Sequence, residues 1–353
     1  MKTLIKNAGN IDFDIMIEDG KIVPVCEKAD AVIDLDGDYI FPGLVDIHSH
    51  GCINYDTTDG THLFEMSEHL AKNGITSWLP TTMTVSIEDI KKVVNIELPK
   101  WENAANVLGF HLEGPYIANE YKGAQNEKYI KNPDIDEFNT FKNAVMVTIA
   151  PELDGSAEFI EKCPAVVSLG HSGADYETAL EAMDKGAMCL THTMNAMTPF
   201  HHRSPGLVGA AIEKNIYIQV ICDGLHLHKS MVTALYRTFG ADRMILISDS
   251  MRACGMPDGK YDLGGQDVYI KNKVARLADG TIAGSTSTLF DCVKKAIEFG
   301  IPMNDAFKMA SQTPATLIKA NKGRFDTGYD ADFVILNKDL EIKDVMINGK
   351  MID

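Results

Sequence analysis

Six residues of this chain have the types and spacing of metal ligands. His48 and His50 lie two residues apart in LVDIHSH, so an extended backbone would point both imidazoles to the same face. Glu113 ends the run VLGFHLE, and the Gly-Pro that follows it turns the chain. The other candidates follow three later apolar runs in the same way, and they are His171, His192 and Asp249.

Together these residues predict a catalytic divalent metal ion. Histidine nitrogens and carboxylate oxygens are ligands of such ions, and a catalytic site keeps one position open for water. Each residue alone has a simpler interpretation, as a polar loop residue or a carboxylate that caps a loop. A metal site accounts for all of them at once, whereas the simpler interpretation must account for each one separately.

The chemistry that follows from this ligand set is hydrolysis. A bound divalent ion lowers the pKa of a coordinated water and polarises a carbonyl oxygen. A carboxylate beside the ion, such as Asp249, can accept the proton of that water and deliver it to a leaving nitrogen or oxygen. The ligand set therefore predicts hydrolysis of an amide, an ester or a cyclic amide, and it does not identify the substrate.

A repeated strand and helix pattern would bring these residues together. Amphipathic segments such as 176–183, where apolar residues recur with the period of a helix, alternate with short apolar runs. Eight such runs are expected to form strands, at residues 44–48, 75–82, 107–113, 145–152, 166–171, 187–192, 216–223 and 244–249. Open parallel sheets share this pattern, but nearly every run here ends in an ionisable or hydrogen-bonding residue. Because barrel strands converge on one mouth, the pattern favours an α/β fold with a (β/α)8 TIM-type barrel.

The two ends of the chain differ from this middle part. Residues 1–41 and 326–353 alternate apolar and polar residues and contain turn signals such as Asp19-Gly20 and Asn348-Gly349. They predict a small β-sandwich domain formed by both termini, around a barrel that spans residues 42–325.

The alternation of strands and helices is interrupted once, directly after Asp249. A β-hairpin excursion is expected near residues 255–282, with turns at Asp258-Gly259 and Asp279-Gly280, and its position suits a cover over the barrel mouth. Two helices are expected after it, at residues 289–300 and 304–320.

Composition and charge exclude several classes of partner. The chain has 353 residues, with 33 Lys and Arg against 50 Asp and Glu, which gives a formal net charge of −17. Such a surface disfavours nucleic acid and anionic membrane, which need a basic footprint. No apolar run reaches the length of a transmembrane helix, and acids interrupt the first residues where a secretory signal would be apolar. Seven Cys without a CxxC pair predict reduced thiols and, with the other features, a cytoplasmic protein.

Longer motifs resemble one known family. In chain order they are FPGLVDIHSHG, HLEGPYI, KGAQN, GHSGADY, THTMNAMTPFHHRSPGLVGA, DGLHL, SDSMRACGMPDG and IAGSTSTL. They are similar to the motifs of N-acetylglucosamine-6-phosphate deacetylases of the amidohydrolase superfamily, and the similarity covers nearly the whole chain. The HxH motif is shared across the superfamily, whereas HLEGP together with THxxNAM and RxPG is specific to this family. The resemblance implies hydrolysis of N-acetyl-D-glucosamine 6-phosphate to D-glucosamine 6-phosphate and acetate, in amino-sugar catabolism or cell-wall sugar recycling.

The resemblance also implies roles for the candidate ligands. Glu113, His171 and His192 match the principal metal ligands of the family. Asp249 matches its catalytic acid and base, which lies beside the metal as a further ligand. The HxH pair matches the histidines that complete a second metal site in binuclear members. The implied cofactor is a divalent ion, zinc or iron first and manganese or cobalt next, with one or two ions per subunit.

Other motif positions are implied to bind the substrate. They are Asn195 and Ala196 for the sugar, Arg203 and His226 for the phosphate, and Ile282 as a cap on the bound sugar. Gln125 stands where some members carry a His that polarises the acetyl carbonyl, so the identity of the polarising group stays open. The family completes its phosphate site across a dimer, which implies a homodimer in which Arg203 serves the neighbouring subunit.

Three other interpretations stay open. N-acetylgalactosamine 6-phosphate would require the same chemistry, since the two sugars differ in one hydroxyl and the sequence does not show which side of the pocket offers its partner. Other amidohydrolases, such as cyclic-imide hydrolases and deaminases, fit less well because many of them use a carboxylated Lys where Glu113 stands. A barrel that has lost catalysis and serves as an interaction protein is the third, because a fold does not imply a function.

Overall fold

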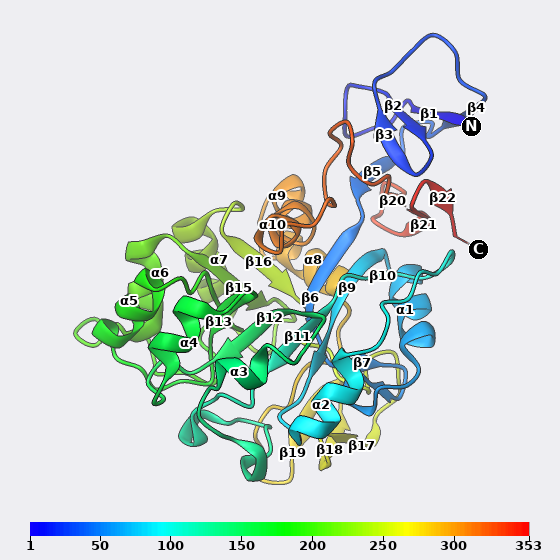
Figure 1. The fold of residues 1–353 in the computed structure, drawn as a ribbon. Coiled ribbons are helices and arrows are strands. Elements are labelled where there is room, and N and C mark those ends of the chain that lie inside the picture. Colours follow the sequence, from blue (N-terminus) through cyan, green and yellow to red (C-terminus); the bar gives the residue numbers. More distant parts are fainter. Residues whose placement is uncertain (353) are drawn as a thin grey trace.

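A barrel of eight parallel strands lies at the centre of the molecule, of which the computed structural model describes residues 1–352 (Figure 1). The strands follow one another around the barrel in chain order. They are β6 (Leu44–Ser49), β9 (Ile75–Thr82), β11 (Phe110–Glu113), β12 (Ala144–Ile149), β13 (Val166–Leu169), β14 (Cys189–Leu190), β15 (Tyr217–Ile221) and β16 (Met244–Ile247). Just beyond β16 the ring closes onto β6, where Asp249 N donates to His48 O at 2.9 Å and His50 N donates to Ser250 O at 2.7 Å.

Each of the eight predicted runs overlaps one of these strands, with one interruption. The run at 107–113 forms two pieces, β10 (Asn106–Val107) and β11, which pair with successive parts of β9. Gly109 lies between them with a φ of 128°, and a Cβ there would lie 2.3 Å from a methyl group of Val145. The chain can therefore pass this point only without a side chain.

The strands carry apolar residues on both faces because both faces are buried. Val45, Ile47 and Leu79 point into the barrel, where they pack with apolar residues of the later strands. Leu44 and Trp78, one position away on the same strands, belong to the larger cluster between the strands and the helices. This alternation is the period of a strand, and it explains why the runs read as continuously apolar.

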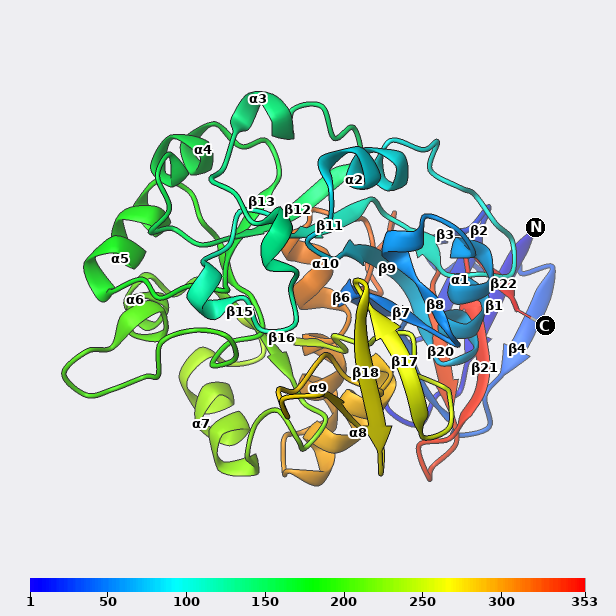
Figure 2. The same ribbon diagram turned by 90° about the horizontal axis from the view of Figure 1, so that it is seen from below.

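Helices form the outer layer around the barrel, except α10, whose Ala315 and Leu317 pack with the side chains inside it (Figure 2). They are α1 (Leu63–Lys72), α2 (Ile87–Val94), α3 (Ile135–Phe138), α4 (Ser156–Lys162), α5 (Tyr176–Asp184), α6 (Gly206–Lys214), α7 (Lys229–Phe239), α8 (Leu289–Glu298), α9 (Met303–Met309) and α10 (Gln312–Leu317). The amphipathic segment predicted at 176–183 lies within α5, which the Asp175 side chain caps by accepting from Thr178 N. No helix among the described residues is long and apolar enough to cross a lipid bilayer.

The segment expected to form one helix at 304–320 is instead divided into α9 and α10, so that prediction is wrong in its length. Ser311, at the junction, leaves helical geometry with φ of −135° and ψ of −77°. Pro314 lies in the first turn of α10, where its missing N–H removes no helical hydrogen bond. A proline at this place begins a new helix more easily than it continues an old one.

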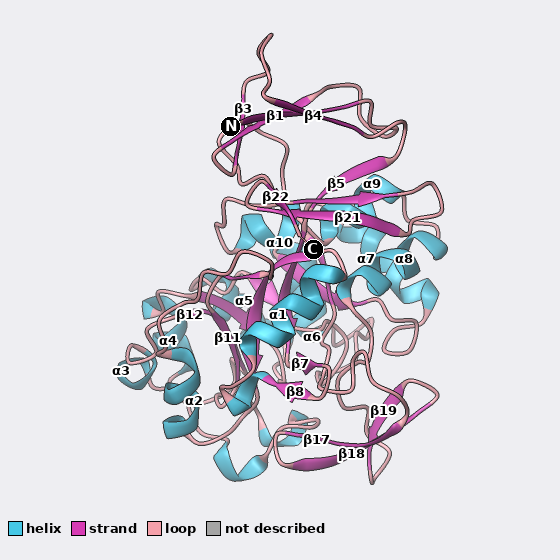
Figure 3. Ribbon diagram, turned by 90° about the vertical axis from the view of Figure 1, so that its right-hand side faces the viewer, coloured by secondary structure: helices cyan, strands magenta, loops and turns pink. Residues whose placement is uncertain are grey.

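Two four-stranded sheets form a small domain at one end of the molecule (Figure 3). The first sheet comes from the N-terminus and contains β1 (Lys2–Lys6), β2 (Ile15–Glu18), β3 (Lys21–Val23) and β4 (Ala31–Asp34). The second joins both ends of the chain and contains β5 (Tyr39–Pro42), β20 (Phe333–Leu336), β21 (Ile342–Ile347) and β22 (Lys350–Met351). The predicted fold class, a (β/α)8 barrel with a β-sandwich formed by both termini, is confirmed. The domain boundaries at 41–42 and 325–326 stay a prediction.

Strand β20 of the second sheet is buried on both faces, because the sheet lies between the first sheet and the barrel. Phe333 and Ile335 of β20 pack into the sandwich, whereas Val334 belongs to the cluster that covers the barrel. Phe41 of β5 stacks on Phe307 of α9 with ring centroids 3.7 Å apart. One residue, Gly43, separates β5 from β6. The small domain therefore continues directly into the first barrel strand.

The excursion after Asp249 is an antiparallel sheet of three strands, where one hairpin was expected. Its strands are β17 (Gly259–Leu263), β18 (Gln266–Lys271) and β19 (Val274–Leu277). The turns lie at Gly264-Gly265 and Asn272-Lys273, all with positive φ. Asp258, expected to lie in a turn, precedes β17, and its carboxylate accepts from the backbone N–H groups of the second turn. The sheet lies at the opposite end of the molecule from the small domain, over the carboxyl ends of the barrel strands (Figures 1 and 2).

Short elements complete the loops at this end. They are the strands β7 (Gly51–Cys52) and β8 (Tyr55–Asp56) and the 3-10 helices η1 (Thr57–Asp59), η2 (Asn119–Tyr121) and η3 (Glu127–Tyr129).

Candidate metal and active site

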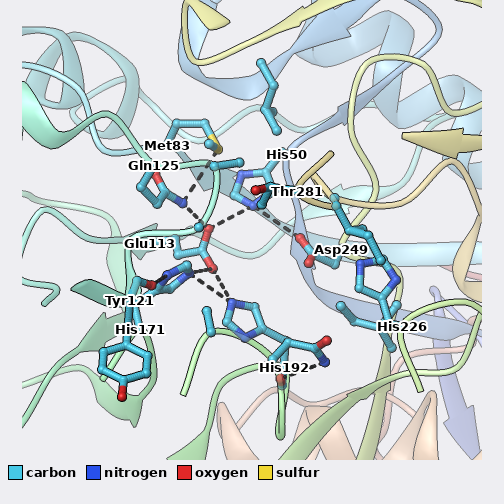
Figure 4. Close-up of a pocket in the computed structure, with 18 of the residues that line it drawn as sticks. His50, Met83, Glu113, Tyr121, Gln125, His171, His192, His226, Asp249 and Thr281 are labelled. Atoms are coloured by element: carbon cyan, nitrogen blue, oxygen red, sulfur yellow. Dashed lines mark hydrogen bonds and ion pairs between the residues drawn. The ribbon is translucent and has the colours of Figure 1, made fainter. Parts of the chain in front are cut away.

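The six candidate ligands meet at the carboxyl ends of the barrel strands. His48 lies on β6 and His50 directly after it, Glu113 ends β11, and His171, His192 and Asp249 each lie two residues beyond a strand. All six are buried, with exposed fractions between 0% and 7%. A cavity of about 440 Å³ opens above them, and Figure 4 shows five of the six on its wall. His48 lies beneath this wall. The barrel therefore gathers residues that are up to 201 positions apart, as the sequence predicts.

The Glu113 carboxylate is at the centre of the cluster. Its Oε1 lies 2.8 Å from His192 Nε2, 3.1 Å from His171 Nε2 and 3.3 Å from His48 Nε2. Its Oε2 lies 3.1 Å from His50 Nε2. The Asp249 carboxylate faces the same two histidines of the HxH motif, with Oδ1 at 3.5 Å from His48 Nε2 and 3.3 Å from His50 Nε2.

Oxygen atoms on the outer side of the cluster fix the protonation of three imidazoles. His48 Nδ1 lies 3.0 Å from Gln219 Oε1, His50 Nδ1 lies 3.2 Å from Thr81 O, and His171 Nδ1 lies 2.7 Å from Tyr121 O. These oxygens can only accept, so each Nδ1 carries the proton. In the neutral imidazole, the lone pair of Nε2 then points toward Glu113, which is the arrangement of a metal-ligating histidine.

This arrangement fits a divalent cation. The Nε2 atoms of His171 and His192 lie 3.1 Å apart, and those of His48 and His50 lie 3.3 Å apart. Two lone pairs at such a distance repel each other, and a cation that both coordinate removes the conflict. Two groups have their ligand atoms close enough to hold an ion, and they share Glu113: one adds the HxH pair, and the other adds the two later histidines.

Both carboxylates of the cluster are held in the charged form. Burial alone would raise the pKa of Glu113, but the neighbouring imidazoles, His48 and His171 first, hold it well below its usual value. Burial opposes ionisation of Asp249 as well, and the two histidines of the HxH motif lower its pKa. Despite burial, the same carboxylates raise the pKa of His48 and His50, so a cation would displace protons from these imidazoles and meet two negative charges.

The backbone is strained where these residues enter the cavity. His171, His192 and Asp249 have φ values of 48°, 25° and 47°, and Ala196 has 48°. Residues other than glycine adopt this left-handed conformation rarely, and it persists only where the surrounding structure enforces it. Such residues gather at functional sites, and here three of the four are candidate ligands.

Five of the six residues implied to bind the substrate line the cavity: Gln125, Asn195, Ala196, His226 and Ile282. Gln125 already uses both ends of its amide, because Oε1 accepts from Thr84 N at 2.7 Å and Nε2 donates to Glu113 Oε2 at 2.5 Å. Ile282 reaches the cavity from the segment that follows β19.

Arg203 does not reach the cavity of its own chain. It is exposed, on the loop between β14 and α6 that extends away from the barrel, and its Nη1 lies 2.7 Å from His202 Nε2 (Figure 2).

The comparisons with known proteins agree with this site. The model of the amidohydrolase family matches residues 39–352, which is most of the chain. The chain belongs to the amidohydrolase family. The N-acetylglucosamine-6-phosphate deacetylase of Lysinibacillus sphaericus is 35% identical to this amidohydrolase over 99% of the chain and 96% of the relative. The N-acetylgalactosamine-6-phosphate deacetylase of Escherichia coli O157:H7 is 32% identical over 96% of the chain and 94% of the relative.

Solved structures give the same result for the fold. The N-acetylglucosamine-6-phosphate deacetylase of Pasteurella multocida is 29% identical to this amidohydrolase, and the two superpose with a TM-score of 0.92 over 99% of each chain. The enzyme of the same name from Thermotoga maritima is 34% identical, with a TM-score of 0.88 over 99% of each chain. The resemblance inferred from the motifs is therefore confirmed, and the amidohydrolase is a hydrolase that acts on amide bonds.

Sequence reasoning missed several residues that orient the ligands of this amidohydrolase. Gln219 is a buried polar residue inside the apolar run IYIQVICD, and that contrast was a usable signal. Asp223, which holds His226, ends the same run. Thr81 and Tyr121 act through backbone carbonyls, which every residue has, so no residue type marks them.

Proposed function

We propose that this amidohydrolase removes the acetyl group from N-acetyl-D-glucosamine 6-phosphate and releases D-glucosamine 6-phosphate and acetate. The observation that carries the proposal is the buried cluster of Glu113 with four imidazoles and Asp249 at the floor of a cavity. Its support is the full-length similarity to relatives from bacteria and animals that bear this activity in their names.

We assign the divalent ions to the two groups that share Glu113. His171 and His192 complete the principal site, and the HxH pair completes a second one. Zinc or iron is the first choice, with manganese or cobalt as alternatives, because histidine and carboxylate suit several first-row ions. When bound, such an ion supplies Lewis acidity, which lowers the pKa of water and polarises a carbonyl.

Asp249 is the proposed general base and then general acid. Its carboxylate is ionised, so it can accept the proton of the attacking water and afterwards give it to the departing amine of the sugar. The left-handed backbone at this residue aims the side chain at the cluster from the loop after β16. Gln125 and the imidazoles keep Glu113 in place throughout.

The rest of the cavity suits a phosphorylated amino sugar. Asn195 and Ala196 line the side next to His192, Ile282 covers the cavity, and His226 provides a donor for the phosphate. We assign Arg203 to the cavity of the neighbouring subunit in a homodimer, because it is exposed on its own subunit. The seven cysteines are all free, which supports a reducing, cytoplasmic setting.

N-acetylgalactosamine 6-phosphate is the second candidate substrate, favoured by the similarity to the Escherichia coli O157:H7 relative. The test measures acetate release from both sugar phosphates by the purified chain after loading with zinc, iron, manganese or cobalt. The expected result is metal-dependent release with the gluco epimer preferred. Preference for the galacto epimer would reverse the assignment. Absence of release from either sugar with every metal would favour the interaction scaffold.

A further inference from the structure

Within the described part of one chain, the positive charge that the cavity can offer to an anion outside the metal-ligand cluster comes from one histidine, His226. Among the described residues that line the cavity, none is a lysine or an arginine, and Glu113, Glu120 and Asp249 contribute negative charge. His226 is the cation-forming side chain of this lining that lies outside the cluster of metal-ligand candidates. Figure 4 shows it on the wall beside Asp249. Of the described groups that this chain itself places around the cavity, this imidazole is the one that can attract a phosphate group, beside the Arg203 that we assign to the neighbouring subunit.

Asp223 holds His226 in a fixed position. Its Oδ2 lies 2.7 Å from His226 Nδ1, and its Oδ1 accepts from the backbone N–H groups of Leu225 and His226 at 2.8 and 2.9 Å. The two side chains are 1% and 7% exposed. Because Nδ1–H is given to the carboxylate, Nε2 is the ring nitrogen left for a ligand.

Each member of the pair favours the charged form of the other. Burial would lower the pKa of His226, but the hydrogen bond and the charge of Asp223 outweigh it, so this pKa lies above its ordinary value. Burial would raise the pKa of Asp223, and the imidazole keeps it below its ordinary value. The imidazolium held by the Asp223 carboxylate therefore persists to a higher pH than an unpaired imidazolium would.

Few charged or titratable groups on the neighbouring elements affect the pKa of His226. Asp249, beyond β16, adds to the raised pKa of His226. On α8, Lys295 packs against Gly224 and pairs with Glu298 at 2.6 Å, so its charge is compensated. At the start of α7, His228 Nδ1 bonds to the Ser230 hydroxyl at 2.8 Å.

We propose that Asp223 is a positioning residue that keeps His226 doubly protonated and aims its Nε2–H at the anionic group of the substrate. The proposal rests on the proposed function, which makes that group the 6-phosphate. A hydrogen bond from an imidazolium to a phosphate oxygen is charge-assisted and stronger than one from a neutral imidazole. Affinity for the phosphorylated sugar is full below the raised pKa and is lost as the pH rises through it.

The kinetic test compares the wild type with Asp223→Asn, which keeps the size and the Oδ1 acceptor but removes the charge. The expected result is a KM for N-acetylglucosamine 6-phosphate that rises about tenfold at neutral pH with kcat nearly unchanged. The pH at which KM begins to rise should move to lower values. N-acetylglucosamine without phosphate should show the same KM in both proteins. Asp223→Glu should restore part of the affinity.

A second measurement does not depend on catalysis. NMR titration of the His226 imidazole should give a raised pKa in the wild type, a lowered one in Asp223→Asn, and the wild-type value in Asp242→Asn, a matched change at an exposed aspartate that pairs with Lys308. Sulfate, whose charge is constant between pH 6 and 9 in ordinary buffers, should perturb the His226 resonance more at the acidic end.

The experiments can contradict the proposed deacetylase function and the proposed role of Asp223 independently of each other. If the wild type releases no acetate from any sugar phosphate, the proposed function fails, while the NMR titration and sulfate binding still decide the role of Asp223. A wild-type His226 that titrates at or below its ordinary pKa overturns the inference, whatever the variants do. An unchanged KM in a folded Asp223→Asn protein overturns it as well.

Discussion

Gln219 Oε1 lies 3.0 Å from His48 Nδ1, so one buried amide on β15 sets the protonation of a histidine on β6. The same oxygen lies 3.4 Å from the backbone N–H of His192. Gln219 thereby connects the two halves of the metal-ligand cluster, since His48 belongs to one group and His192 to the other. Residues in this supporting position fix the tautomer and the orientation of the ligating imidazole.

Replacing Gln219 with leucine should weaken metal binding. The Nδ1–H of His48 would lose its acceptor inside the protein, and the proton could move to Nε2, where it blocks coordination. We expect metal affinity to fall by about 10- to 100-fold and the free energy of unfolding to fall by about 1–3 kcal/mol. Chelator competition and urea unfolding would measure the two effects. Gln312→Leu, far from the cluster at the start of α10, is the matched control, and an equal loss there would refute the specific role.

Gln125→Leu should impair metal retention more than substrate affinity. Its Nε2 donates to Glu113 Oε2 and its Oε1 accepts from Thr84 N, so neither end is free for the acetyl group. We expect a lower metal content after dialysis and a lower kcat, with KM changed by less than about threefold. Metal analysis together with steady-state kinetics would show this. A normal metal content with a strongly raised KM would instead make Gln125 a direct substrate contact.

Asp249→Asn should nearly abolish turnover with little change in metal content. General acid and base catalysis typically contributes about 10²- to 10⁴-fold, and the amide cannot accept the proton. The principal metal group, Glu113 with His171 and His192, is untouched by this change. Acetate release and metal analysis on the same preparation are the measurements. Wild-type rates in the variant would contradict the assigned role.

Phe41→Ala should destabilise the junction between the small domain and the barrel. The Phe41 ring is 4% exposed and stacks on Phe307 at 3.7 Å, so its loss leaves a cavity between β5 and α9. Large-to-small changes of this kind cost about 3–5 kcal/mol. Urea unfolding would measure the loss, with Phe64→Ala as a control because that ring is 43% exposed. Equal effects of the two changes would argue against a tightly packed junction.

The metal cluster was predictable because each candidate ligand lies at or just beyond the end of a strand, and strand ends converge in a barrel. The eight apolar runs were visible for the same reason, since strands buried on both faces carry few polar residues. The left-handed backbone at His171 and His192 was not predictable, because neither is glycine. Tertiary contacts impose the positive φ values at these residues, and no local sequence pattern predicts them.

The division of α9 from α10 had a local signal, Pro314, which a helical period alone conceals. Other features depended on contacts distant in sequence. The second turn of the three-stranded sheet lies at Asn272-Lys273, where Asp258 stabilises it from 14 residues away. Thr81 and Tyr121 contribute carbonyl oxygens whose positions depend on the path of the whole chain.

The single residue between β5 and β6 has a consequence for cutting or rearranging the chain. A Cβ on Gly43 would lie 2.2 Å from Thr76 Oγ1, so β5 enters the barrel through a fixed, narrow passage. β5, Gly43 and β6 form one continuous extended segment, and His48 and His50 lie at its far end. A truncated protein that starts at residue 42 would lose most of β5, which anchors this segment in the small domain. New termini placed in the exposed turn at 272–273 would leave this segment intact. A circular permutant opened there should therefore keep the metal-ligand cluster better than the truncation does.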